Sequence, residues 1–449
     1  MSQNEISRRD FINGVLVAAG TATVGSMFGG CSHSKILEGS PEKSDGDINR
    51  DPRALRGGNL PAAFVIGHWM RDERLTFRPH SVQVSAGMGD SMKGKFDIVD
   101  DSYRPDVVIV GSGMSGLSAA FYLSRKNPKI NLLILDANST FGGNAALDRS
   151  PPLPMVASTG ATYAVAPYSD FLRELYRETG VDWETNVVPS PFYNYFFDEH
   201  TPYIQPQTKR WVKDVYGAGL KDMPYSPQII KDLEAAKKDF VKWYNTEGGP
   251  TDPPDKSNPK YDDLDSMTFH DYLIRKKGFH PAVSDYYTRF TIDALAGKTT
   301  QVSAYSAIDF LGAEYHPLFA YPGGNAGIAQ RVAQWLISDR APDLNPSLLD
   351  QPTARVRIRQ EAVMLRADIT EKNASVIYFK NGKMRRVTAK SVIIATQAHS
   401  AQHAVQHLLD VQTRSAMKQT TLVPVVVANV TLRRAAPLLH AEASAVEEP

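Results

Sequence analysis

Apolar residues are concentrated in short runs, and the densest of these runs surround residue 120. The segments DVVIV (106–110) and INLLILDA (130–137) are almost continuously apolar, which predicts strands buried on both faces. Between them, GLSAAFYLSRK (116–126) carries apolar residues at helical spacing. The pattern therefore predicts a βαβ unit of about 30 residues, with parallel strands and a right-handed crossover.

The rest of the chain shows helical periodicity first and alternating strands afterwards. Helices are predicted at 168–180, 226–245, 267–278 and 327–339, and a run of strands at 354–396 with a hairpin turn at Asn381-Gly382. One further strand is predicted at 423–432. Three segments lack periodicity and are expected to be irregular: a polar linker at 32–58, the stretch 59–104, and a Pro- and Asp-rich loop at 249–263.

This order predicts an α/β fold in which a Rossmann-type dinucleotide-binding domain is split by an inserted domain of helices and antiparallel strands. The inserted domain is expected to hold the substrate. The boundaries that we expect are 1–31 for an export signal, 32–103 for a linker and irregular segment, 104–165 and 321–412 for the two parts of the dinucleotide domain, 166–320 for the substrate domain, and 413–449 for a return segment and tail.

Composition narrows the class of partner. Among 449 residues, 50 basic and 49 acidic side chains give a net charge of +1, so the chain lacks the basic excess that nucleic-acid binding requires. Cys31 is the only cysteine, which excludes an internal disulfide and a cysteine-based metal site. A small-molecule substrate is the partner that remains.

The first predicted strand runs into a GxGxxG motif formed by Gly111, Gly113 and Gly116. In the mechanism of this motif, the first glycine permits the tight turn, the second lets the backbone approach a pyrophosphate, and the third lets helix and strand lie close together. Ser115 lies in the first turn of the helix, where N–H groups face the phosphates. Asp136 ends the second strand, where a carboxylate can accept hydrogen bonds from a ribose hydroxyl.

A second glycine pair favours FAD over NAD. Gly142 and Gly143 follow Asp136 by six and seven residues, an arrangement that resembles the signature of the flavoprotein amine-oxidase superfamily. The resemblance implies an FAD cofactor and a glutathione-reductase-like fold. The chain departs from the family in having Asn144 where arginine is common and Asp136 where glutamate is common.

The resemblance covers roughly residues 104–434 and is closest to the bacterial spermidine dehydrogenase group, which also carries twin-arginine leaders. It implies that Gly160, Ala161 and Thr162 lie beside the isoalloxazine ring and that the backbone of Val363 meets the adenine. The activity that it implies is oxidation of an amine or polyamine by hydride transfer to flavin. Two alternatives remain open: a flavin desaturase or dehydrogenase acting on an apolar substrate, and a truncated flavoprotein without catalysis.

The N-terminus resembles a twin-arginine export signal. Arg8 and Arg9 precede a weakly apolar run from Val15 to Phe28 that is too short and too small to favour a membrane span. We therefore expect the twin-arginine machinery as a partner and a periplasmic location. The alternative is a basic leader followed by a helix. Cys31 also ends a sequence, FGGC, that could serve as a lipoprotein cleavage site.

The C-terminus departs from the family. Relatives return to the cofactor with a late Gly-Asp motif, whereas the Ala- and Glu-rich segment 435–449 contains none. This predicts a shortened or frameshifted chain, whose fold a partner or further segment would complete. The alternative is a fold that closes differently from that of the family.

Catalytic side chains are hard to recognise in the sequence of a flavoprotein, because the flavin itself accepts the hydride. His399, His403 and His407 are spaced as one helix face and could hold a metal, but a polar surface stripe explains them better, so we predict no metal site. The aromatic cluster at 192–203 could line a channel for a cationic substrate, but ordinary packing explains it better.

Overall fold

The computed structural model describes residues 61–86, 93–145, 147–148, 157–158, 160–161, 164, 167, 169–184, 188–189, 203–204, 211–212, 218–246, 259–315, 319–321, 324–337 and 346–419. The predicted export signal, the polar linker, the strand at 423–432, the C-terminal tail, Thr162 and the aromatic residues at 192–197 lie outside them. The chain divides into a sheet unit, Met1–Thr162 with Gly323–Asn429, and a helical unit, Tyr163–Pro322 with Val430–Pro449.

The sheet unit is built on a four-stranded parallel sheet in the order β12-β5-β4-β16. The predicted βαβ unit forms its centre, as β4 (Val107–Val110), α5 (Met114–Lys126) and β5 (Leu132–Leu135). The outer strands are β12 (Val356–Arg359) and β16 (Ser391–Ile394). Both inner strands are buried at every position, which is why their sequences are continuously apolar. The predicted α/β fold is confirmed.

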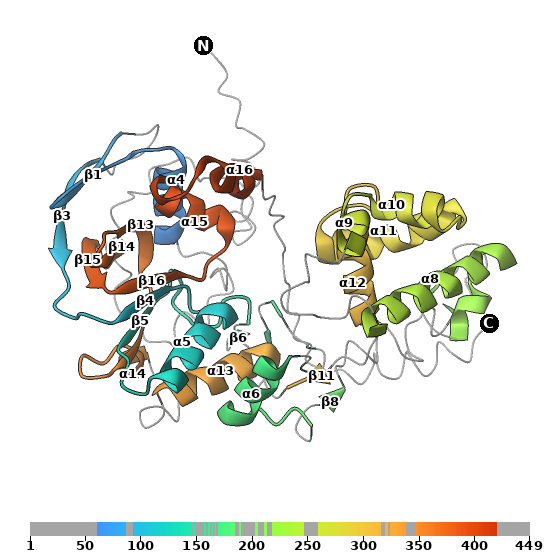
Figure 1. Cartoon of the computed structure of the whole chain (residues 1–449), viewed down its shortest axis with the longest axis horizontal. Helices are drawn as coiled ribbons and strands as arrows, with labels where there is room; N and C mark the ends of the chain where they lie inside the picture. The colour runs from blue at the N-terminus through green and yellow to red at the C-terminus, as the bar shows by residue number, and fades with distance from the viewer. Residues whose placement is uncertain are drawn as a thin grey trace, which may run out of the picture. The chain divides into compact units, whose positions relative to one another are not determined.

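Each face of the parallel sheet is covered by a different layer (Figure 1). Helices α5 and α13 (Gly324–Ile337) cover one face, where Phe121 meets Trp335 at 4.5 Å between ring centroids. On the other face, Val110 and Leu135 share a core with Tyr378 of a second sheet. Two layers of apolar contact therefore fix the carboxyl ends of β4 and β5, where the predicted site lies.

The second sheet has six strands in the order β1-β2-β3-β15-β14-β13. Its last three strands form the predicted meander, as β13 (Val363–Ile369), β14 (Ala374–Lys380) and β15 (Lys383–Ala389). The hairpin at Asn381-Gly382 is confirmed: Lys380 pairs with Lys383, and both turn residues have positive φ, 49° and 73°. Two left-handed residues match the twist of the flanking strands, which is why Asn-Gly is favoured there.

The expectation of an irregular segment at 59–104 is wrong. This stretch contains α4 (Pro61–Arg71), β1 (Leu75–Arg78), β2 (Ser81–Val84) and β3 (Gly94–Asp100). Strands β1 and β2 are only four residues long, and β3 pairs in parallel with β15, far away in sequence. Local periodicity carries no trace of such a distant partner, so the segment has the pattern of a loop.

The helical unit centres on α8 (Pro227–Thr246) and α12 (Ala304–Glu314), which pack closely. A Cβ on Gly312 would lie 2.8 Å from the Phe240 carbonyl oxygen, so glycine allows this close approach. Helix α6 (Asp170–Thr179) occupies its predicted position and ends at Gly180, which has a φ of 71°.

Two predictions in the helical unit need correction. The single helix expected at 267–278 is a short α10 (Phe269–Asp271) that continues as the π-helical η2 (Tyr272–Lys276). The loop expected at 249–263 ends in α9 (Pro259–Asp265), whose residues Tyr261 and Leu264 are buried. Polar residues dominate α9, so tertiary packing rather than its own pattern stabilises it.

The remaining elements are short or peripheral. In the sheet unit they are β6 (Leu147–Asp148), β7 (Ala157–Ser158), α14 (Pro346–Leu349), α15 (Ala398–Val405), η4 (Gln406–Leu408) and α16 (Val411–Gln419). In the helical unit they are β8 (Val188–Pro189), β9 (Tyr203–Ile204), β10 (Trp211–Val212), η1 (Ala218–Asp222), α11 (Pro281–Leu295) and β11 (Phe319–Ala320). Within the described ranges, no helix is long and apolar enough to cross a membrane.

Candidate dinucleotide site

The turn after β4 contains two glycines that the fold itself requires. Gly111 has a φ of 105°, and a Cβ there would lie 2.4 Å from the carbonyl oxygen of Ala395. A Cβ on Gly116 would lie 1.9 Å from the carbonyl oxygen of Gly111. Any larger residue at either position would push the start of α5 away from the sheet.

Gly113 differs, because no contact among the described residues requires glycine there. Its φ is −66°, and the atom nearest to an added Cβ is the Cα of Gly143 at 3.8 Å, an ordinary contact. Gly113 is also the N-cap of α5 and provides no side-chain hydrogen bond to the first turn, in which Ser115 is exposed. The N-cap residue therefore leaves the backbone N–H groups at the positive end of α5 without a side-chain cap, which is the arrangement that binds phosphate.

The second glycine pair lies directly against this turn. The N–H of Gly142 donates to the Ser112 carbonyl at 2.9 Å, and Gly142 forms a parallel bridge with Gly113. Gly143 has a φ of 60°, and a Cβ there would come within 3.0 Å of the Gly113 Cα. Two glycine segments separated by about 30 residues thus form one continuous backbone surface.

A third segment extends this surface. The N–H of Ala161 donates to the Asn144 carbonyl at 2.9 Å, and a Cβ on Gly160 would lie 2.6 Å from the same oxygen. The structure therefore brings Gly160 and Ala161 beside Asn144, which is exposed. Thr162, predicted to belong to this group, lies outside the described residues.

Asp136 is tied to the protein itself. Its carboxylate is 6% exposed and accepts hydrogen bonds from the Ser112 N–H at 2.7 Å, the Ser112 hydroxyl at 2.5 Å and the Asn138 N–H at 2.8 Å. A carboxylate has about four lone pairs, so Asp136 retains one acceptor position for a ribose hydroxyl. Its main effect is to hold the glycine turn against the end of β5.

Asn138 supplies a second acceptor that the sequence analysis did not single out. Its Oδ1 atom is buried and has no hydrogen-bond partner in the described part of the chain. A buried acceptor without a partner costs free energy, about 1–3 kcal/mol, unless a ligand satisfies it. The sequence feature that could have identified Asn138 is its position two residues after Asp136, the acid that ends the second strand.

Val363 lies at the edge of the same site. It begins β13 directly after Ala362, whose N–H donates to the Asp136 carbonyl at 2.7 Å. Its side chain is buried in an apolar cluster with Trp69, so only its backbone is available to a ligand. The backbone contact with adenine stays a prediction, and the burial of the Val363 side chain leaves it no role in binding.

The three histidines do not share one helix face. His399 and His403 lie on α15 with ring centroids 6.2 Å apart, but α15 ends at Val405. His407 lies in η4, and its Nε2 is 2.9 Å from a carboxylate oxygen of Asp368. Among the residues that the structure describes, no group of three or more histidine, cysteine or acidic side chains is placed to hold a metal ion.

A parallel sheet with a glycine turn at a helix N-terminus, an acid at the end of the next strand and a second glycine pair beside the turn defines a dinucleotide-binding α/β protein. Comparison with known protein families specifies the class further. The model of the flavin-containing amine oxidoreductase family matches residues 114–447, and the chain belongs to that family.

Individual relatives are more distant. The chain is 37% identical over 102 residues to the thiamine thiazole synthase of Coprinopsis cinerea, covering 23% of this chain and 28% of that protein. It is 23% identical over 309 residues to the L-amino-acid oxidase of Echis ocellatus, covering 66% of this chain and 53% of that protein. A solved putrescine oxidase variant shares the fold with a TM-score of 0.51 at 19% identity, covering 71% of this chain and 64% of that one. The chain thus spans about a quarter of the thiamine thiazole synthase and about half of the oxidase.

Proposed function

We propose that this protein binds FAD and oxidises an amine, with the flavin as hydride acceptor. The observation that supports FAD binding most directly is the environment of Gly113. A Cβ at Gly113, the N-cap of α5, would make only an ordinary contact of 3.8 Å, although Gly111 and Gly116 are held by close protein contacts. The protein's own packing does not explain a glycine at this position. A ligand that approaches the backbone closely, as a pyrophosphate does, would explain it.

Each part of the cofactor has residues that would hold it. The pyrophosphate would lie on Gly113 and the first turn of α5, with Gly143 beside it. Asp136 and the Oδ1 atom of Asn138 would accept the ribose hydroxyls, which would satisfy the buried amide oxygen. The backbone of Val363 would meet the adenine. FAD, when bound, supplies the hydride acceptor, so the protein's contribution is to bind it and to orient it.

An amine is the substrate class that family membership favours. A putrescine oxidase and an L-amino-acid oxidase are among the proteins that the chain resembles. We propose an amine or polyamine as the substrate, in keeping with the resemblance to the spermidine dehydrogenase group.

We further propose that the protein is exported. The Arg8-Arg9 pair and the apolar run that follows are typical of a twin-arginine signal. Proteins that take this route cross the membrane folded, which suits a protein that loads a dinucleotide cofactor before export.

The test is a matched pair of glycine substitutions. Gly113→Ala places a methyl group at an ordinary contact distance of 3.8 Å from the Gly143 Cα, so the free protein should keep its stability within about 0.5 kcal/mol, whereas FAD affinity should fall at least tenfold. Gly116→Ala places a methyl group 1.9 Å from a carbonyl oxygen and should cost about 2–3 kcal/mol of stability before any ligand is added.

FAD affinity is measured by flavin fluorescence quenching, and stability by thermal unfolding without ligand. NAD serves as the comparison ligand for all three proteins. Unchanged FAD affinity in Gly113→Ala, or tight NAD binding by the unaltered protein without any flavin binding, would refute the proposed cofactor.

A further inference from the structure

A second polar site lies one strand away from the glycine turn. A cavity of about 390 Å³, which we term the hairpin cavity, is lined by Asp350, Arg359, Lys380, Asn381, Lys383 and Arg385. Arg359 ends β12, and the last four of these residues belong to the β14–β15 hairpin or its turn. None of the six belongs to the glycine segments of the dinucleotide site.

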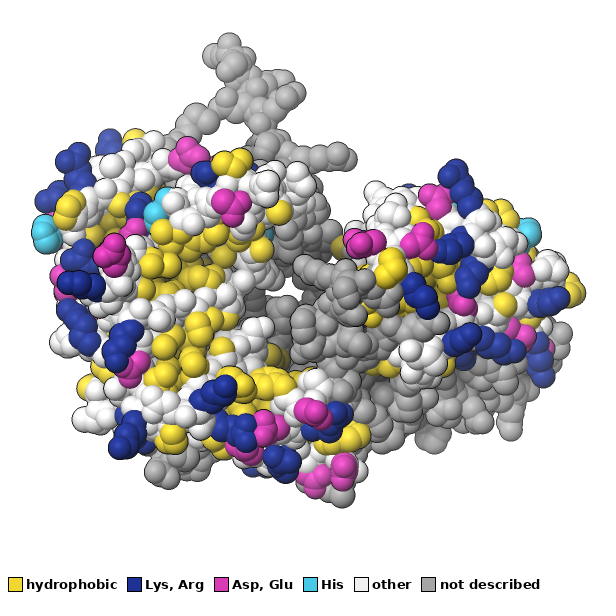
Figure 2. All heavy atoms as spheres, viewed as in Figure 1, with side chains coloured by type: hydrophobic (Ala, Val, Ile, Leu, Met, Phe, Trp, Pro, Cys, Tyr) yellow, Lys and Arg dark blue, Asp and Glu magenta, His cyan; other side chains and the backbone are white. Residues whose placement is uncertain are grey.

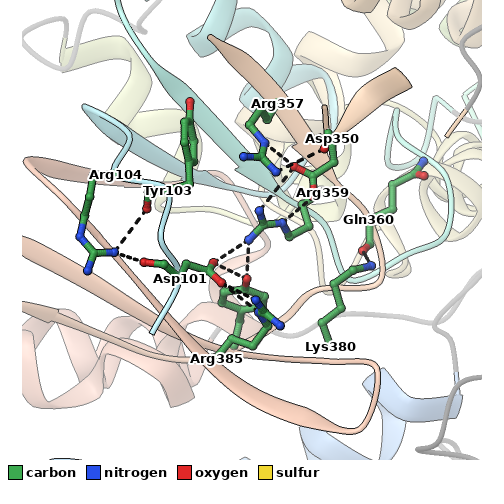
Figure 3. A network of polar contacts seen from close by, with 10 residues as sticks. Asp101, Tyr103, Arg104, Asp350, Arg357, Arg359, Gln360, Lys380 and Arg385 are labelled. Carbon is green, nitrogen blue, oxygen red and sulfur yellow. Dashed lines mark hydrogen bonds and ion pairs between the residues drawn. The ribbon is translucent and has the colours of Figure 1, made fainter. Parts of the chain in front are cut away.

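The alternation of β12 explains why an arginine points into this space. Arg357 and Arg359 pair in register with Leu133 and Leu135, which face the second sheet, so both arginines face the same way. Each is over nine-tenths buried at the open edge between the two sheets. Figure 3 shows Arg359 lying between two carboxylates, Asp350 and Asp101.

The basic groups around the cavity outnumber the acids. Asp350 holds Arg357 and Arg359, at 2.5 and 2.7 Å, and Asp101 holds Arg359 and Arg385, at 2.6 and 2.9 Å. These bonds neutralise much of the charge of the three arginines. Two lysines, Lys380 and Lys383, remain. On the face of the sheet unit drawn in Figure 2, Lys and Arg side chains gather beside β3 and β15, with acids between them.

Lys380 is partly buried, and its bonding is incomplete. Its ammonium donates one hydrogen bond, to the Gln360 carbonyl at 2.6 Å, and no carboxylate in the described ranges lies within ion-pair distance. Burial, Arg359 and Arg385 lower the pKa of Lys380, and the nearby Glu361 and Asp350 offset this only in part. An ammonium has three donors, so two are left for a ligand in the cavity. Lys383, across the hairpin turn, is exposed and likewise has no ion-pair partner in the described chain.

We propose that the hairpin cavity binds the phosphate group of a small molecule, with Lys380 and Lys383 as direct ligands and Arg359 as a fixed positive charge behind them. A phosphate bears two negative charges near neutral pH and several acceptor oxygens, which matches two lysines with free donors. The cavity falls within the 300–1,000 Å³ range of small-molecule sites, so it has room for an organic group as well as the phosphate.

The site is separate from the dinucleotide turn but connected to it. The carbonyl of Arg359 accepts the Asp136 N–H at 2.9 Å, and the Glu361 N–H donates to the Asn138 carbonyl at 2.9 Å. Because the two sites share no lining residue, phosphate can be titrated into the hairpin cavity after the turn has been filled with FAD.

The experiment uses the full chain saturated with FAD, at constant ionic strength, in isothermal titrations with three probes: inorganic phosphate, ribose 5-phosphate and ribose. Lys380→Gln and Lys383→Gln each remove one ligand. Lys372→Gln is the matched control, because it makes the same change in the exposed β13–β14 turn, away from the cavity.

We expect saturable binding of both phosphate probes and none of ribose. Each cavity substitution should weaken phosphate binding about tenfold or more, and Lys372→Gln should change it less than twofold. Lys383 is exposed, so its substitution should leave the unfolding temperature unchanged. Ribose 5-phosphate binding more tightly than inorganic phosphate would assign the cavity to a phosphorylated metabolite, and equal affinity would assign it to the free ion. Absence of saturable phosphate binding, or equal weakening by all three substitutions, would overturn the proposal.

Discussion

Asp101 should be among the most sensitive positions in the sheet unit, because it holds together the edge between the two sheets. Its carboxylate is 3% exposed and accepts hydrogen bonds from Arg359 at 2.6 Å, Arg385 at 2.9 Å and the Tyr378 hydroxyl at 2.6 Å. Burial raises the pKa of Tyr378, so its hydroxyl stays protonated and donates. Asp101→Asn preserves the shape but removes the charge that compensates two arginines, and turns an amide N–H₂ toward one of them.

The expected loss follows from removing the carboxylate that pairs with Arg385 and one of the two carboxylates that compensate the buried Arg359, which keeps Asp350 at 2.7 Å. Breaking one side of a buried ion pair costs about 3–5 kcal/mol, and the remaining partner of Arg359 places Asp101→Asn at the lower end, about 3 kcal/mol, whereas an exposed pair contributes about 0–1 kcal/mol. The chain offers a matched control in the preceding residue: Asp100 is paired with Arg386, with the two side chains 48% and 24% exposed. Asp100→Asn should therefore cost less than about 1 kcal/mol.

The assay is urea unfolding of the two variants and the unaltered chain, followed by far-UV circular dichroism. With an m-value of about 3 kcal/mol/M, the Asp101 variant should unfold at least about 1 M earlier in urea and the Asp100 variant within about 0.3 M of the parent. Equal shifts in the two variants would show that burial does not decide the strength of these pairs, and the reasoning would be wrong.

Two further predictions concern the helical unit and the N-terminus. Burial raises the pKa of Asp309 from 3.8 to about 6, and its Oδ1 has no hydrogen-bond partner in the described chain. The folded state therefore retains a proton that the unfolded state releases, so this contribution to stability is present below about pH 4 and is lost as the pH rises through 6. Asp309→Asn should stabilise the protein at pH 7 by about 1–2 kcal/mol, a value reduced for the partial solvent exposure of the side chain. At about pH 4 the substitution should give no such gain. The unfolding temperature measures both effects, and an equal shift at the two pH values would contradict the prediction. Replacing Arg8 and Arg9 together by lysine should retain the protein in the cytoplasm, as measured by cell fractionation, and unchanged periplasmic accumulation would count against the twin-arginine route.

The sequence by itself determined the centre of the sheet unit. The runs at 107–110 and 132–135 are apolar at every position because both faces of those strands are buried, and the glycines follow at the spacing that the turn requires. The Asn381-Gly382 hairpin was equally readable, because its signal is confined to two residues with left-handed backbone. Such features are local, so a local pattern reveals them.

Tertiary structure alone decided the features that depend on distant partners. Strand β3 pairs with β2 and with the distant β15, and the sequence before Asp106 carries no local pattern that reveals the second of these partners. The difference between Gly113 and Gly116 appears only when their neighbours are placed, because the sequence does not show whether an added Cβ would clash with a carbonyl oxygen or make an ordinary contact. The same holds for Asp136, whose carboxylate is committed largely to Ser112, and for the hairpin cavity, whose charges come from segments more than 20 residues apart. Burial and partnership are properties of the packed chain, and they determine which polar groups remain available to a ligand.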